Sequence, residues 1–195
     1  TGNLTITDKI NLEGTASATK MDSINGLISA KEISLSNASI GTIKTATSKL
    51  TGITADTIAL QNNSTLGNIA GDITAKTINM ITNSQLEGII NSITADTILL
   101  ENSSIKSVKT NLTANDWIKA TNSKIFFDNA GNDSLIEAKA ISADNLGKVF
   151  ELSNSNVFTN ANNLVIKDGS SSSGKIINFT GLTSIKSCEN ALTEN

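Results

Sequence analysis

This chain lacks His, Tyr, Pro and Arg altogether, and all 15 of its basic residues are Lys. Without His, the usual general base and the commonest metal ligand are missing. Without Arg, the chain has no planar guanidinium group to bind phosphates or guanine edges with two hydrogen bonds. A net charge of −3 further opposes nucleic-acid binding. An oxyanion clamp or a carboxylate pair is all that is left for catalysis, so we expect no enzyme and no cofactor.

Cysteine, aromatic residues and long apolar runs are also scarce. Cys188 stands alone, so no disulfide can form within the chain. No run of 18 apolar residues occurs, so no membrane span is expected. The start of the sequence lacks the basic and hydrophobic regions of a signal peptide, which we expect to be absent or already removed. Aromatics are 3% of residues, so Ile, Leu, Val, Ala and Met must build the core.

The centre of the chain contains a repeat of about 20 residues, within the range of solenoid proteins. The segment 53–60 reads ITADTIAL, and it returns at 73–80 as ITAKTINM and at 93–100 as ITADTILL. Weaker copies occupy 28–35 and the region that begins at Leu112. A second motif keeps a constant distance from the first: NSTLGNI at 63–69, NSQLEGI at 83–89 and NSSIKSV at 102–108.

Both motifs alternate apolar and polar residues, the period-2 pattern of a half-buried strand. One such coil cannot bury its apolar side alone, but coils stacked about 4.8 Å apart can. Stacking predicts three inward rows: Ile58, Ile78 and Ile98; Leu60, Met80 and Leu100; Leu66, Leu86 and Ile105. It also places Asn63, Asn83 and Asn102 at equivalent corners, where their amides can hydrogen-bond from coil to coil.

The predicted fold is therefore all-β: a right-handed parallel β-helix, or β-solenoid, with coils of about 20 residues. Residues 1–27 are expected to form an irregular first coil or cap, and 28–126 the regular repeats. Residues 127–195 are expected to form irregular, wider coils, because Phe126, Phe127, Phe150 and Phe158 bring larger side chains. The Gly/Ser-rich segment 168–174 is expected to project from the rod as a loop.

The Asn/Ser/Thr-rich coils with Ile and Leu rows resemble the β-helical passenger domains of bacterial secreted adhesins. Autotransporter passengers and filamentous-haemagglutinin-like exoproteins are the families in question, and the resemblance covers residues 28 to 125. It implies a bacterial origin, export and display at the cell surface, often for adhesion and virulence. A leucine-rich repeat is a weaker alternative, because Ile78-Asn79-Met80-Ile81-Thr82-Asn83 fits its core but the next apolar residue comes one position late.

Several polar or aromatic residues are candidates for a site. Asp128, Asn132 and Asp133 lie around a single turn similar to the calcium-binding nonapeptide of RTX proteins, although that chemistry normally needs consecutive copies. Trp117 lies where the repeat gains a residue, so it covers a bulge or offers a sugar-stacking platform. Asp56, Lys76 and Asp96 would alternate in charge along one outer face, and the threonines at 54, 74 and 94 and at 57, 77 and 97 would form rows. Ice-binding arrays space such threonines two residues apart in one strand, not three.

The first functional hypothesis is a structural or adhesive module of a bacterial cell-surface or secreted protein. Its expected partner is a glycan or protein on a host or neighbouring cell, with further chain of a larger protein or self-association as other possibilities. An S-layer or fibre subunit is one alternative. A carbohydrate-active β-helix of the lyase or tailspike type is another, and the acidic residues Asp128, Asp133 and Glu137 are where its site would be sought.

Overall fold

The computed structural model describes residues 4–14, 19–21, 24–41, 43–44, 52–129, 132–138, 150–153, 155–159, 163–168, 177–178, 184–187 and 192–194. Within these ranges the chain forms strands and turns and contains no helix, so none of it could cross a membrane as a helix. All strand pairings between successive coils are parallel. The all-β solenoid that the repeat predicts is confirmed.

The first half of the rod, up to the most regular coils, contains nine strands. They are β1 (Leu4–Glu13), β2 (Thr19–Met21), β3 (Ile24–Asn25), β4 (Leu27–Ser36), β5 (Ala38–Ile40), β6 (Ile43–Lys44), β7 (Gly52–Gln61), β8 (Thr65–Ile81) and β9 (Gln85–Glu101). The second half contains β10 (Ser104–Val108), β11 (Asn111–Thr121), β12 (Lys124–Phe127), β13 (Asp133–Ala138), β14 (Phe150–Ser153), β15 (Asn156–Thr159), β16 (Asn163–Asp168), β17 (Ile177–Asn178), β18 (Ser184–Ser187) and β19 (Leu192–Glu194).

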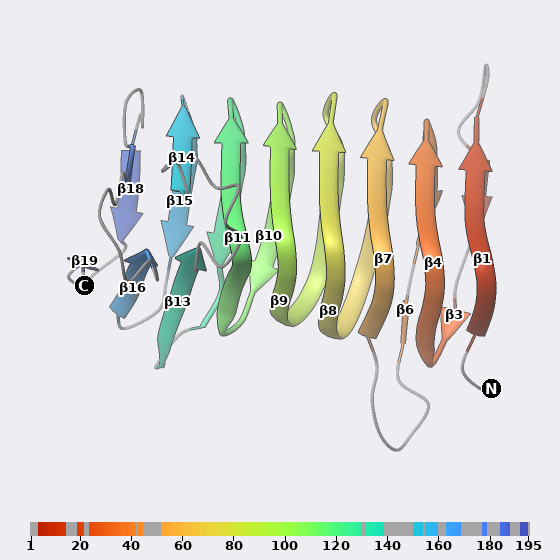
Figure 1. Ribbon diagram of the computed structural model, residues 1–195, viewed down its shortest axis with the longest axis horizontal. Helices are drawn as coiled ribbons and strands as arrows, with labels where there is room; N and C mark the ends of the chain where they lie inside the picture. Colours follow the sequence, from red (N-terminus) through yellow and green to blue (C-terminus); the bar gives the residue numbers. More distant parts are fainter. Residues whose placement is uncertain are drawn as a thin grey trace.

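Most strands up to β12 form two walls of one rod, while β3 and β6 form a further parallel stack that continues into β8. One wall stacks β1, β4, β7, β8, β9 and β11 in that order, and the other stacks β2, β5, β8, β9, β10 and β12. β8 and β9 belong to both walls because each bends around the lower edge of the rod (Figure 1). The chain rises along the front strands, returns behind them and advances toward the C-terminus, so the solenoid is right-handed (Figure 1).

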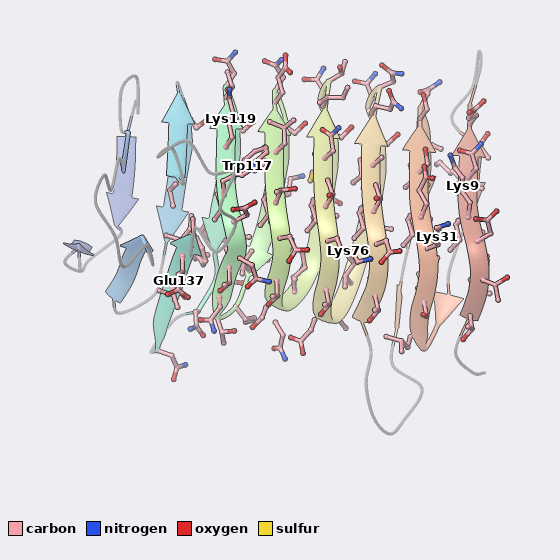
Figure 2. All side chains as sticks on the ribbon, in the orientation of Figure 1. Lys9, Lys31, Lys76, Trp117, Lys119 and Glu137 are labelled. Carbon is pink, nitrogen blue, oxygen red and sulfur yellow. The ribbon has the colours of Figure 1, made fainter. Side chains whose placement is uncertain are left out.

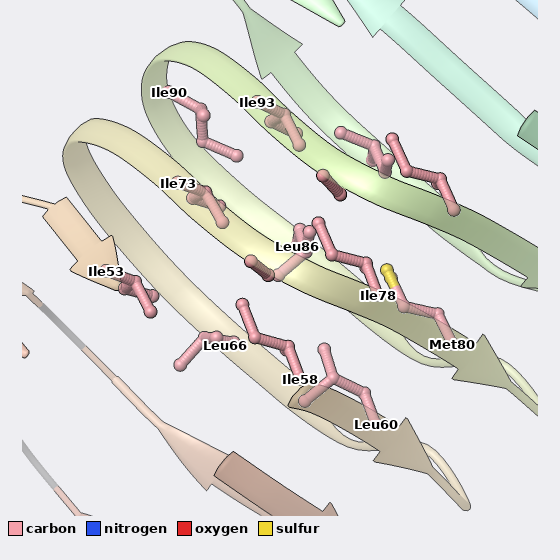
Figure 3. Packing of buried hydrophobic residues seen from close by; sticks show 14 of the residues in the cluster. Ile53, Ile58, Leu60, Leu66, Ile73, Ile78, Met80, Leu86, Ile90 and Ile93 are labelled. Carbon is pink, nitrogen blue, oxygen red and sulfur yellow. The ribbon is translucent and has the colours of Figure 1, made fainter. Parts of the chain in front are cut away.

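The predicted inward rows are present in register. Ile58 pairs with Ile78, and Ile78 with Ile98. Met80 lies between Leu60 and Leu100, and Leu86 between Leu66 and Ile105. All of these side chains are buried. Figure 3 shows the rows of Ile58 and Ile78, Leu60 and Met80, and Leu66 and Leu86 stacked between the walls. The row of Ile53, Ile73 and Ile93 is equally buried and continues as Leu112 and Ile136.

The interval between stacked residues changes along the rod. It is 20 residues from Ile53 to Ile73 and again to Ile93, whereas Ile125 pairs with Val157, 32 residues later. At the other end β1 lies in full register with β4 through Ile10–Ile33 and Leu12–Leu35, after a bulge between Ile6 and Lys9. Phe127 is fully buried and is the largest side chain in the described core. The side chains of Phe150 and Phe158, Cys188 and the loop residues 169–174 lie outside the described residues.

A leucine-rich repeat does not fit this arrangement. Such a repeat has one strand with a helix or 3₁₀ segment opposite. Here the wall opposite the first one also consists of parallel strands. Residues 65–69 and residues 104–108 both belong to it, and each segment pairs with a strand of a neighbouring coil.

The core row predicts a large difference between inward and outward substitutions on one strand. Ile78→Ala should lower the free energy of unfolding by about 2–5 kcal/mol, because it opens a cavity in a fully buried row. Thr74→Ala, on the exposed side of the same strand, should change it by about 0.5 kcal/mol or less. Urea unfolding of both variants measures this, and similar losses in both would contradict the inward assignment of Ile78.

Candidate binding surface

The upper edge of the rod is built by asparagines in a left-handed backbone conformation. Successive coils turn here, at the arrowheads of β7, β8, β9 and β11 (Figure 1). Asn tolerates this conformation better than other residues that carry a side chain. We call these residues the asparagine corner; their φ angles are 48° (Asn37), 61° (Asn63), 59° (Asn83), 48° (Asn102) and 49° (Asn122).

Hydrogen bonds join the corners of neighbouring coils. The Asn63 N–H donates to the Thr82 carbonyl at 2.8 Å, and the Asn83 N–H donates to the Asn102 carbonyl at 2.7 Å. The Asn83 side-chain amide donates to the Asn63 side-chain oxygen at 3.3 Å. The predicted amide contact between stacked coils is therefore confirmed for this pair.

A row of buried serines lies beneath the asparagine corner, and it was not predicted from the sequence. Its members, here called the serine row, are Ser64, Ser84, Ser103, Ser123 and Ser155, all at most 4% exposed. The Ser84 hydroxyl donates to the Ile81 carbonyl at 2.7 Å, and the Ser123 hydroxyl donates to the Thr121 carbonyl at 2.8 Å. The Ser123 hydroxyl also accepts the Ser103 N–H at 3.2 Å. Each hydroxyl thus satisfies backbone groups that the turn frees from the strand ladder.

Three consecutive corners enclose a polar depression of about 300 Å³, here called the corner groove. The first two coils each contribute the corner asparagine, the serine that follows it and the next residue, and the third contributes Asn122 and Lys124. The lining residues are Asn83, Ser84, Gln85, Asn102, Ser103, Ser104, Asn122 and Lys124. The groove therefore follows the direction of stacking, and amides and hydroxyls dominate its walls.

The predicted charge alternation is present on the outer face. The Lys76 ammonium contacts the Asp56 carboxylate at 2.8 Å, and Asp96 accepts a hydrogen bond from the Asn115 amide at 2.9 Å. The hydrogen bond from Lys76 to Asp56 raises the pKa of Lys76 above its usual 10.5, and the charges of Asp56 and Asp96 add to the effect. These side chains are exposed, so the pair contributes little to folding.

The threonines form two rows along the stack. Thr54, Thr74 and Thr94 lie in one row, and Thr57, Thr77 and Thr97 in the other. The Thr97 hydroxyl donates to the Thr77 hydroxyl at 3.4 Å. A hydroxyl bond within the stack accounts for this pair without a ligand.

Trp117 lies on a bulge of β11, where the sequence predicted an extra residue. Ala114 pairs with Ala95, but the next pair on the same strand is Trp117 with Thr97, so β11 holds two residues where β9 holds one. The indole is half-buried on the outer face, close to Lys119 in Figure 2. Trp117 thus covers the bulge and still exposes part of its ring, so the platform interpretation stays a prediction.

The acidic turn after β12 is described only in part. Asp128 is half-buried and its N–H donates to the Val108 carbonyl at 2.8 Å, while the Asn132 N–H donates to the Asn129 carbonyl at 3.0 Å. The Asp133 side chain is outside the described residues. In the described part of the chain, no three His, Cys, Asp or Glu side chains gather as a metal site would require. Calcium binding by Asp128, Asn132 and Asp133 stays a prediction.

Comparison with known proteins supplies no relative for this rod. A scan against protein families, a search of curated proteins and a search of solved structures each found no match. The surface of the rod is therefore what indicates its function.

The asparagine corner predicts opposite effects for two substitutions at Asn102. Asn102→Ala should lower the free energy of unfolding by about 1–2 kcal/mol, because alanine disfavours the left-handed backbone at φ 48°. Asn102→Gly should be neutral or slightly stabilising, because glycine adopts this conformation without a steric penalty. Thermal and urea unfolding of both variants test this. If Asn102→Gly lowers the free energy of unfolding as much as Asn102→Ala does, the left-handed backbone is not the reason for asparagine at this corner.

The raised pKa of Lys76 predicts a pH dependence confined to alkaline solution. Because the folded-state pKa lies above the unfolded value of about 10.5, the contribution is fully present below that value. It is lost as the pH rises through the folded-state pKa. The stability difference between the native chain and Lys76→Gln, measured by urea unfolding from pH 8 to 12, should therefore shrink only above pH 10.5. A difference that stays constant across this range would contradict the ion pair.

Proposed function

We propose that this chain is a structural and adhesive module of a bacterial cell-surface or secreted protein, and not an enzyme. The observation that carries the proposal is the repetition of the same exposed polar group in four successive coils of the rod. Asn63, Asn83, Asn102 and Asn122 display the same amide at the same corner, and each is exposed. Such a surface suits many weak contacts with a repetitive partner, and simultaneous contacts raise the overall affinity.

The partner is a glycan or protein on a host or neighbouring cell. Support comes from the resemblance to passenger domains of secreted adhesins, which work outside the bacterial cell, and from the parallel β-solenoid that they share with this chain. The outer rows are rich in amides and hydroxyls, the groups that hydrogen-bond to sugars and to peptide backbones alike. Three ion pairs balance part of the charge on the outer faces: Lys9–Glu32, Lys76–Asp56 and Lys106–Glu87.

Trp117 is the aromatic contact of this module. Its half-buried indole lies in register with Thr97 and on the same side of β11 as Lys119. An aromatic face stacks against the apolar face of a sugar ring, while neighbouring hydroxyl and ammonium groups can bond to the ring substituents. The bulge holds the indole in one place, which reduces the entropy lost on binding.

Binding to cells and to immobilised glycans tests the adhesive role. Fluorescently labelled protein should bind cultured epithelial cells or members of a glycan array, and Trp117→Ala should weaken that binding about tenfold. Trp117→Phe, which keeps a smaller aromatic face, should weaken it less, and Thr74→Ala on another outer row should leave it unchanged. Far-UV circular dichroism checks that each variant keeps the β-rod.

One result would overturn the adhesive proposal, and another would remove Trp117 from it. If the native chain binds neither cells nor glycans but sediments as fibres or sheets, a self-assembling subunit replaces the adhesive module. If binding occurs and Trp117→Ala leaves it intact, the indole only covers the bulge.

A further inference from the structure

We propose that the corner groove binds an extended polysaccharide that carries carboxylate groups, such as a polyuronic acid. This inference rests on the proposed adhesive role and assigns it a ligand class and a second place on the rod, separate from Trp117. The groove follows the stacking direction across three coils. A linear polymer laid along it would meet an asparagine amide again at each coil, about 4.8 Å further on.

The walls of the groove offer neutral hydrogen-bonding groups. Asn83, Asn102 and Asn122 are exposed on one side. The left-handed backbone conformation of each residue sets the direction in which its side-chain amide leaves the backbone. An amide both donates and accepts, so it matches a sugar hydroxyl, which does the same. The buried serines beneath them already donate to backbone carbonyls, as the Ser84 hydroxyl does to the Ile81 carbonyl. These hydroxyls therefore form the base of the groove with their hydrogen atoms already bonded.

The other wall is the row of Gln85, Ser104 and Lys124, which are aligned from coil to coil. Gln85 is oriented from outside the groove, because the Lys106 ammonium donates to its side-chain oxygen at 2.6 Å. Lys106 also contacts Glu87, so its charge is balanced there. With its oxygen bound in this way, the Gln85 amide has its two N–H donors left for a ligand.

Lys124 gives the groove its preference for an acidic ligand. It is exposed, it is the one charged residue in the lining, and no carboxylate lines the groove. In the described ranges its ammonium forms no ion pair, whereas Lys9, Lys76 and Lys106 each contact an acidic side chain. An ammonium among amides and hydroxyls fits a carboxylate on a sugar, because charge-assisted hydrogen bonds are stronger than neutral ones.

The overall charge makes this preference testable. The chain has a net charge of −3, so its long-range field repels a polyanion. Any binding of a polyanion must then come from local contacts. The decisive comparison is between Lys124→Gln and Lys31→Gln, which change the net charge equally; Lys31 is an exposed lysine of β4, far from the groove (Figure 2).

Biolayer interferometry with immobilised polygalacturonate measures the binding, and fully methyl-esterified polygalacturonate serves as the uncharged probe with the same backbone. The native chain should bind polygalacturonate and bind the ester at least tenfold more weakly. Lys124→Gln should weaken binding of the acid about tenfold and leave binding of the ester unchanged, while Lys31→Gln should behave as the native chain.

The proposal is overturned if the native chain does not bind polygalacturonate, if acid and ester bind equally, or if Lys31→Gln weakens binding as much as Lys124→Gln does. Cell binding separates this failure from that of the adhesive role. If cells are bound and Trp117→Ala weakens that binding, but Lys124→Gln leaves polygalacturonate binding intact, the groove assignment is wrong and the adhesive role stands.

Discussion

Parallel backbone pairing between successive coils is the constraint on which every other feature of this rod depends. It holds residues 20 positions apart directly above one another, as Ile58, Ile78 and Ile98 show. A single coil buries too little apolar surface to be stable, so the inward rows form only when coils stack. The same register aligns the outward residues, and the chemistry of the surface is therefore a consequence of how the core is packed.

At the corners, this register places the same types of residue next to one another on the surface. An asparagine in the left-handed conformation turns each coil, and the serine that follows it satisfies the backbone groups freed by the turn. Because an asparagine followed by a serine recurs in each regular coil, an exposed asparagine lines the corner groove at each of its three coils. The one departure from that symmetry is the third residue, which changes from Gln85 to Ser104 to Lys124. This change places a positive charge at one end of a neutral groove.

The sequence predicted the inward rows and the asparagine corner because both depend on spacing alone, and spacing can be read directly from residues 53–108. It did not predict the serine row, because a serine next to an exposed asparagine looks like a surface residue until the turn exposes a carbonyl to it. The groove was missed because its walls come from three coils and only their stacking brings Asn83, Asn102 and Asn122 together. The register of β1 was hidden by the bulge between Ile6 and Lys9, which shifts the interval by one residue.

A crystal structure of the chain tests the central claim most directly, through the distances between the Cα atoms of Ile58, Ile78 and Ile98. The account predicts that neighbouring members lie about 4.8 Å apart on parallel strands, with all three side chains turned inward. If these residues lie on separate elements, or if a shift in register turns one of them outward, the rows, the corner groove and the functions built on them are wrong together.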